Sequence, residues 1–209
     1  MEIDSVQYAN ISREMLLTKN FLKIYDQSKD YLDKPPLLFW ISSLFMYVFG
    51  INDFAFRLPS ILIAILAIYS TYKFTNLYYS KEISILASLI LASSQAMFLI
   101  THDVRTDTML MGWVIYGIWQ YAKWLKFQNI NSFILSSSAF AFGMMTKGPI
   151  ALMVPIFAFF PHLILKKQYK LLMRWEYIMG FFIIFVLLIP MNIGLYQQFD
   201  LHPEKELYG

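Results

Sequence analysis

Carboxylates and lysines that stand beside long apolar runs are the side chains of this sequence best suited to chemistry. Asp4 lies four residues before Tyr8 and could act as a general base, or could be a solvated terminal acid. Lys34 follows Asp33 and precedes two prolines, which hold the chain extended ahead of an apolar run. Its ammonium group could bind a phosphate at the depth of lipid headgroups, or could simply anchor the following helix.

A second charged segment lies between two apolar runs, at residues 102–107. It brings Asp103, Arg105 and Asp107 to the mouth of two expected membrane spans, where ionisable groups are functional candidates. An ordinary interfacial loop would also be charged, and Asp107 could instead be the N-cap of the next helix. Lys147 precedes Gly148 and Pro149, and it could face the same phosphate or simply end a helix.

The sequence lacks the motifs of several enzyme classes. It has no phosphate-binding glycine loop, no GxSxG and no HExxH, which argues against nucleotide hydrolysis and zinc proteolysis. With no cysteine there is no thiol nucleophile, thiolate metal site or disulfide. His202, Glu204 and Glu206 have metal-binding chemistry, but a solvated tail is the preferred interpretation. We therefore assign no metal ligand and no cofactor, and leave open only a divalent cation.

Composition places these residues in a membrane protein. The chain has 209 residues, of which 58% are hydrophobic and only 15% charged, whereas a soluble domain has roughly 25% charged residues. The net charge of +3 comes from basic residues scattered through loops, so a nucleic-acid partner is not expected. Membrane lipids are the expected surroundings.

The apolar runs predict an all-α polytopic membrane protein with six transmembrane helices. A helix rises about 1.5 Å per residue and must cross a hydrocarbon core about 30 Å thick. The expected spans are Leu58–Tyr79, Ile83–Thr101, Thr108–Leu125, Ser132–Thr146, Gly148–Leu165 and Tyr177–Tyr196. The fourth and fifth are joined only at Lys147-Gly148-Pro149, which predicts a tight helical hairpin.

One further apolar run, Leu37–Ile51, is too short to be a seventh span. Its 15 residues fall below the roughly 17 that are needed to cross. We expect an interfacial or re-entrant helix, with Trp40 and Tyr47 in the headgroup region. If this run does not cross, residues 1–57, the loop at 102–107 and the tail from residue 197 all lie on the same side of the membrane.

The distribution of lysine and arginine predicts which side that is. The loops after the first, third and fifth expected spans contain eight basic residues, against three in the alternate loops and tail, so the first set should be cytoplasmic. Residues 1–57 add six basic residues to the other side. The lysine and arginine distribution therefore predicts this orientation only if the short loops determine it. The expected organisation is an outer-face first loop with juxtamembrane helices (1–57), a transmembrane bundle (58–196) and the start of an outer-face loop (197–209).

An ordered set of motifs resembles the protein O-mannosyltransferase-like superfamily of GT-C-type glycosyltransferases. It is most similar to the bacterial branch that includes the lipid A aminoarabinose transferases. The matching segments are Asp4-x-x-x-Tyr8, Ile11-Ser12-Arg13-Glu14-Met15, Tyr31-Leu32-Asp33-Lys34-Pro35-Pro36-Leu37-Leu38-Phe39-Trp40, Phe49-Gly50, Phe56-Arg57-Leu58-Pro59-Ser60, Arg105-Thr106-Asp107, Thr146-Lys147-Gly148-Pro149 and Phe199-Asp200-Leu201-His202-Pro203-Glu204-Lys205.

The resemblance implies a GT-C-type helical bundle and a sugar transfer with inversion. The implied donor is a polyprenyl-phosphate sugar, and the acceptor is lipid A, a protein or another glycan. The site would face the periplasm or exterior of the bacterial inner membrane, as part of cell-envelope modification. Asp4 and Asp107 correspond to the catalytic acids of the family, and Tyr8, Lys34, Arg105 and Lys147 are the implied substrate-binding residues.

The sequence departs from the family pattern at Ser5, where a glutamate usually follows the first aspartate. Since the family also has a helix before this aspartate and further spans after the last one here, the chain is expected to be a truncated N-terminal portion. Two other functions stay open. A membrane transporter would place charges near the bilayer midplane, and a truncated homologue could be an inactive membrane scaffold.

Overall fold

Helices form almost all the regular structure in residues 3–27 and 29–201, the part of the chain that the computed structural model describes. In chain order the elements are α1 (Ile3–Thr18), β1 (Tyr25–Asp26), β2 (Lys29–Asp30), α2 (Leu37–Phe49), α3 (Asp53–Thr75), α4 (Lys81–Ala92), α5 (Gln95–His102), α6 (Thr106–Phe127), α7 (Ile130–Lys147), α8 (Ile150–Leu165), α9 (Tyr169–Leu172), α10 (Glu176–Leu195) and the π-helical turn η1 (Tyr196–Asp200).

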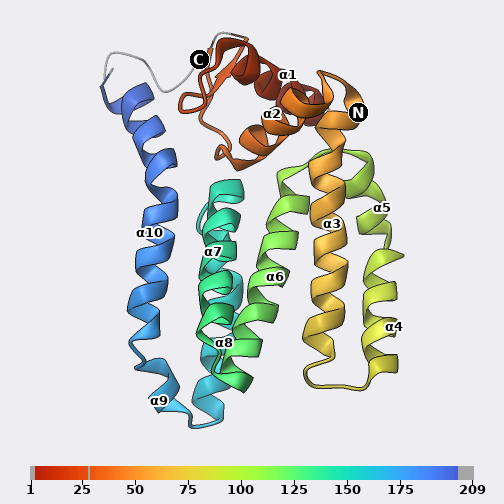
Figure 1. The fold of residues 1–209 in the computed structure, drawn as a ribbon, viewed down its shortest axis with the longest axis vertical. Helices are drawn as coiled ribbons and strands as arrows, with labels where there is room; N and C mark the ends of the chain where they lie inside the picture. The colour runs from red at the N-terminus through yellow and green to blue at the C-terminus, as the bar shows by residue number, and fades with distance from the viewer. Residues whose placement is uncertain (1–2, 28, 202–209) are drawn as a thin grey trace.

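The elements form a bundle that is covered at one end (Figure 1). The long helices α3, α6, α7, α8 and α10 run roughly side by side. The shorter helices α4 and α5 follow one another along the side of α3. The helices α1 and α2 and the antiparallel β1–β2 pair lie across one end. We call the described residues 3–49 the cap, the end that they cover the cap end, and the opposite end the far end.

The helix α2 confirms the helix expected at Leu37–Ile51, and it lies across the cap end rather than along the bundle (Figure 1). Its apolar face packs on α1, where Leu38 and Phe39 are fully buried. Two hydrogen bonds hold α2 against the preceding part of the chain: Ser43 Oγ donates to the carbonyl of Ser12 at 2.7 Å, and Trp40 Nε1 donates to the carbonyl of Phe21 at 2.5 Å.

The expected boundary of the first span is wrong. The helix α3 begins at Asp53, because the side chain of Asn52 accepts a hydrogen bond from the backbone N–H of Ala55 and caps the helix there. Pro59 therefore lies inside the helix rather than beside its start. The helix ends at Thr75, four residues before the expected end.

The second expected span is divided into α4 and α5 at Ser93 and Ser94. Both hydroxyls donate back to carbonyls of α4, Ser93 to Leu89 and Ser94 to Leu91, each at 2.8 Å. Serine side chains that compete for backbone groups in this way weaken and bend helices. The apolar pattern of Ile83–Thr101 could not reveal this interruption.

The other four expected spans match α6, α7, α8 and α10 to within two residues at each end. The expected hairpin is also confirmed. The helix α7 ends at Lys147, and α8 begins at Ile150 directly after Pro149. Gly148 has φ +81°, a backbone conformation that a residue without a Cβ adopts freely.

Two glycines allow α6 to pack closely between α3 and α7. A Cβ added to Gly112 would lie 2.9 Å from the carbonyl oxygen of Ile63 on α3. A Cβ added to Gly117 would lie 2.5 Å from the ring of Phe140 on α7. Small residues at such crossings are typical of helix packing in membranes, where backbones approach closely.

The cap is attached to the end of α10 by a buried glutamine. Gln198 in η1 accepts from the N–H of Ile24 at 2.8 Å, and its amide donates to the carbonyl of Ile24 at 2.6 Å and to Asp30 Oδ1 at 2.7 Å. The neighbouring Gly194 lies so close to Leu22 that an added Cβ would be 2.1 Å from its carbonyl oxygen. Segments more than 170 residues apart are thereby joined at the cap end.

Large apolar side chains cover the outside of the bundle, as expected for a protein surrounded by lipid. On α10 alone, Ile178, Phe181, Phe182 and Phe185 are all exposed. Within the described residues, α3 and the segment Tyr169–Asp200 are long and apolar enough to span a membrane on length and composition, while α2 and α8 are shorter apolar helices. The long helices α6 and α7 are only partly apolar, because α6 contains Gln120 and α7 contains several serines.

Candidate active site

The first part of the candidate site is one face of α1. Asp4 and Tyr8 are four residues apart on this helix, so their side chains lie on the same face. Asp4 is exposed in the first turn, whereas Tyr8 is 3% exposed in the core of the cap. A carboxylate at the surface is thus placed above a buried phenol.

The second part is the segment between the β1–β2 pair and α2. Lys34 Nζ donates a hydrogen bond to Asp33 Oδ2 at 2.7 Å, and the hydroxyl of Tyr31 approaches the same oxygen at 3.4 Å. Pro36 then occupies the N-cap position of α2, so the two prolines lead directly into the helix. The hydrogen bond to Asp33 is the main cause that raises the pKa of Lys34, which therefore carries its charge at neutral pH.

Phe39 of α2 joins these two parts. The rings of Tyr8 and Tyr31 both pack edge-on against Phe39, with centroid distances of 5.8 and 5.9 Å. Burial is the main cause that raises the pKa of both tyrosines, so both hydroxyls stay protonated at neutral pH. They can donate hydrogen bonds to an anion, but they do not act as bases.

Several charged side chains also affect Tyr8. Burial has the largest effect on its pKa; the charge of Lys34 lowers this pKa, and the charges of Asp4, Asp33 and Asp107 raise it. Val104 and Met109, which flank Asp107, belong to the same buried apolar cluster as Tyr8 and Phe39. Packing therefore brings α1, α2 and the start of α6 together at the cap end.

Asp107 and Lys147 add the ends of two bundle helices to this cluster. Asp107 lies in the first turn of α6, Lys147 is the last residue of α7, and the two form an ion pair. The alternative that Asp107 is the N-cap is wrong, because α6 begins at Thr106 and Arg105 occupies the N-cap position. A carboxylate one turn into a helix is still favoured by the helix dipole.

Arg105 lies two residues before Asp107, with an extended backbone and a partly buried side chain. Val104 and Thr106 on either side of it are buried, which fixes the chain at this point. All six residues singled out in the sequence therefore lie at the cap end. Their catalytic and binding roles remain predictions.

Ser5 occupies the position where a glutamate was expected. It is 1% exposed, and its hydroxyl has no hydrogen-bond partner within the described residues. The side chain thus points into the cap rather than to the charged surface beside Asp4. The site is built without a second acid at this position.

No group of three or more His, Asp or Glu side chains in residues 3–27 and 29–201 could hold a metal ion. His202, Glu204 and Glu206, which the sequence offered as metal-capable, lie outside the described residues. The described site is one of carboxylates, ammonium groups and protonated phenols.

Two residues of this region were not recognised from sequence. Asp33 holds Lys34 and contacts Tyr31; it was part of the matching segment from Tyr31 to Pro36, but no role was expected for it. Gln198, which attaches the cap to α10, gave no sequence signal, because its partners are far away in the chain.

The family described as dolichyl-phosphate-mannose-protein mannosyltransferase has a sequence model that matches residues 33–193. The match begins at Asp33 and includes Lys34, Arg105, Asp107 and Lys147, whereas Asp4 and Tyr8 lie before it.

Among curated proteins, the chain is similar to two bacterial enzymes named undecaprenyl phosphate-alpha-4-amino-4-deoxy-L-arabinose arabinosyl transferase. The one from Yersinia pestis is 32% identical over 172 residues, and the one from Erwinia tasmaniensis is 28% identical over 174 residues. Each alignment covers 80% of this chain but 31% of the relative. The chain therefore spans about a third of the length of these relatives.

Among solved structures, the fold matches ArnT from Cupriavidus metallidurans in two states. The TM-score is 0.84 for the apo state and 0.85 for the state bound to undecaprenyl phosphate, at 18% sequence identity. The matches cover 97% and 98% of this chain and 38% of the other. At this identity the likeness concerns the fold, and it confirms the expected GT-C-type helical membrane bundle.

Proposed function

Because the chain belongs to the dolichyl-phosphate-mannose-protein mannosyltransferase family, we propose that it forms part of a membrane glycosyltransferase that uses a polyprenyl-phosphate sugar. The observation that carries this proposal is the arrangement at the cap end, where the charges of Asp4, Lys34 and Asp107 all act on Tyr8 and Lys147 pairs with Asp107. A transferase of this kind needs cations for a departing phosphate and a carboxylate for an attacking hydroxyl.

Lys34, Lys147 and Arg105 are the proposed binding groups for the donor phosphate. Lys34 is paired with Asp33, and Lys147 with Asp107. Both pairs are partly exposed to solvent, so separating them costs little free energy. A phosphate can therefore replace the carboxylates as the partner of these ammonium groups and gain charge-assisted hydrogen bonds.

Asp4 and Asp107 are the proposed catalytic carboxylates. The acceptor hydroxyl gives its proton to one carboxylate as its oxygen bonds to the anomeric carbon. The bond from that carbon to the phosphate oxygen breaks at the same time, and negative charge grows on the polyprenyl phosphate. One displacement of this kind inverts the anomeric carbon. The protonated hydroxyl of Tyr8, whose pKa both carboxylates raise, is a proposed hydrogen-bond donor to the substrate.

The relatives guide the choice of donor and acceptor. The curated relatives are named for undecaprenyl phosphate carrying 4-amino-4-deoxy-L-arabinose, and one matched structure holds undecaprenyl phosphate. We propose an undecaprenyl-phosphate sugar as the donor and a lipid of the cell envelope, such as lipid A, as the acceptor.

The proposed orientation places the cap end on the periplasmic or exterior face of the bacterial inner membrane. The lysine-rich turns at the far end support this, because short cytoplasmic loops are enriched in basic residues. Val6 is exposed on the cap and Gln168 is exposed at the far end, and the chain has no native cysteine. In intact cells, an impermeant thiol reagent should label Val6→Cys but not Gln168→Cys. The reverse pattern would overturn the orientation.

The direct test of the donor site is equilibrium binding of undecaprenyl phosphate to the purified chain. Lys34→Ala removes a charge-assisted contact and should weaken binding by about 1.5–3 kcal/mol, roughly 10- to 150-fold in Kd. Lys29→Ala is the matched control, because Lys29 is an exposed lysine of the same cap. It should change Kd by less than about twofold. Equal losses in the two variants, or no binding by the parent, would remove the support for this site.

A further inference from the structure

A cavity of about 190 Å³ lies between α6, α7, α8 and α10, away from the candidate active site. Its walls are almost entirely apolar and include Phe133, Leu152, Phe159, Leu163 and Ile184. For comparison, an apolar cavity of about 150 Å³ in a protein stays free of water and binds benzene. This cavity is therefore suited to hydrocarbon.

The cavity opens sideways onto the outer surface of the bundle. Ile156 and Phe160 of α8 and Phe181 of α10 line it, and each is more than half exposed. These three side chains therefore lie between the cavity and the outer surface and form its side toward the lipid. A chain from the surrounding lipid can therefore enter between α8 and α10 without unfolding the bundle.

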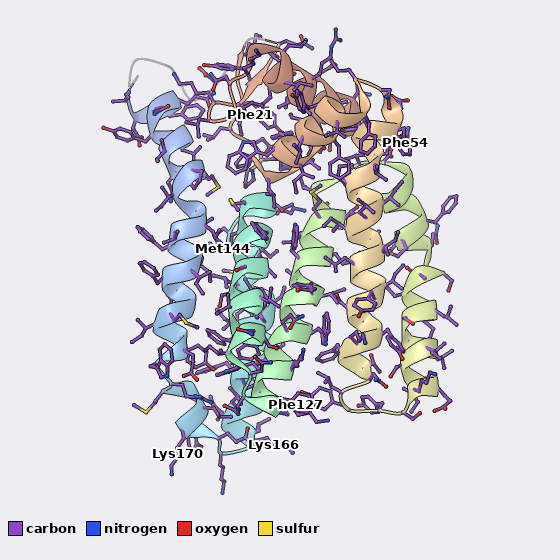
Figure 2. All side chains as sticks on the ribbon, in the orientation of Figure 1. Phe21, Phe54, Phe127, Met144, Lys166 and Lys170 are labelled. Atoms are coloured by element: carbon purple, nitrogen blue, oxygen red, sulfur yellow. The ribbon has the colours of Figure 1, made fainter. Side chains whose placement is uncertain are left out.

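Basic residues lie beyond the far end of this opening. The segment 165–173 contains Lys166, Lys167 and Lys170 and no acidic residue, whereas the following Arg174 is paired with Glu176. Figure 2 shows Lys166 and Lys170 at the far end, beyond the last turns of the bundle. Lys166 follows the lining residue Leu163 by three residues, about 4.5 Å along a helix axis.

The same segment has the exposed side chains that are typical of a membrane interface. Tyr169 and Trp175 are each more than half exposed, and Met173 is 89% exposed. Aromatic side chains beside lysines are enriched at the depth of lipid headgroups. The basic cluster is thus at the correct depth for a headgroup whose acyl chain runs into the cavity.

We propose that this cavity binds one acyl chain of an anionic phospholipid, whose headgroup phosphate is held by Lys166 and Lys170. Positive charge beyond one end of an apolar groove matches an anionic lipid better than a zwitterionic one, because basic clusters beside a membrane attract anionic headgroups. The site is separate from the cap end, so it does not depend on the proposed transfer reaction.

The test is photolabelling of the chain in phosphatidylcholine vesicles. The probe is phosphatidylglycerol with a diazirine in one acyl chain, and the comparison probe is phosphatidylcholine with the same chain. Phosphatidylglycerol should label the peptides of α8 and α10 that line the cavity at least about threefold more strongly. Ile156→Trp, at the exposed mouth, should fill the entrance and abolish this labelling while leaving undecaprenyl phosphate binding unchanged.

Matched charge variants separate a specific site from general attraction. Lys166→Ser with Lys170→Ser should reduce phosphatidylglycerol labelling to the level of phosphatidylcholine. Lys73→Ser with Lys81→Ser removes the same charge from the last turn of α3 and the first turn of α4, at the same end, and should leave labelling unchanged. The proposal is overturned by equal labelling with the two probes, by equal losses in the two double variants, or by absence of adducts on the cavity peptides.

Discussion

Both ends of the bundle have an ion pair, but the pair at the cap end is exposed to solvent, whereas the carboxylate of the pair at the far end is buried. At the cap end, Asp107 and Lys147 pair at the surface, with 53% and 36% of their side chains exposed. At the far end, Glu176 is 3% exposed and is held by Arg174, whose Nε donates to Glu176 Oε2 at 3.1 Å. The guanidinium group of Arg174 also lies 5.2 Å from the ring centroid of the buried Trp124.

This difference separates charges that stabilise the fold from charges that are available to a ligand. A buried carboxylate that loses its partner is left without compensation, so the far-end pair cannot separate at low cost. An exposed pair contributes little stability and can exchange one partner for another. The Asp107–Lys147 pair at the cap end can therefore exchange a partner for a phosphate, whereas the Arg174–Glu176 pair at the far end is a fixed structural pair.

The largest expected effect on stability is at the far end. Arg174→Met leaves the carboxylate of Glu176 buried and unpaired, and it should lower the free energy of unfolding by about 3 kcal/mol. The measurement is unfolding in mixed micelles, followed by tryptophan fluorescence.

The matched variant at the cap end is Lys147→Met, which removes the cation of the exposed pair. It should change the free energy of unfolding by less than about 0.5 kcal/mol. Similar losses in the two variants would contradict the contrast between a structural pair and an available one.

An effect between those two is expected where the cap meets α10. Gln198→Leu leaves the N–H and carbonyl of Ile24 without their partners, which should cost about 2 kcal/mol. Amide hydrogen exchange should become faster in residues 20–27 of the cap and stay unchanged in the far-end half of α6. Uniform acceleration across the chain would show instead that the glutamine stabilises the whole bundle.

The sequence predicted the bundle well, because long apolar runs and the Gly148-Pro149 turn are local signals. It failed where side chains decide the boundaries. Asn52 starts α3 early through its capping hydrogen bond, and the serines at 93 and 94 interrupt a continuous apolar run. The short β1–β2 pair was not expected either, because two-residue strands leave almost no pattern.

For the candidate site, the sequence provided the residues but not their partners. Asp107 and Lys147 are forty residues apart, and only the packing of α6 against α7 brings them together. The resemblance to a known family indicates Asp4 and Asp107, and in the structure both of these carboxylates raise the pKa of Tyr8. The role of Asp33 could not be predicted, because its contacts depend on how the segment before α2 folds.

The measurement that tests the central claim most directly is the rate of sugar transfer from undecaprenyl phosphate by the gene product that contains this chain. The parent is compared with Asp4→Asn and with Asp107→Asn at equal protein level in the membrane. An asparagine keeps the shape of the side chain but cannot accept a proton, so Asp4→Asn should lower the rate by about 100-fold or more. Asp107→Asn should also cause a large loss, because it removes the charge that faces Lys147. Transfer at the parental rate by both variants would contradict the assignment of the cap end as the active site.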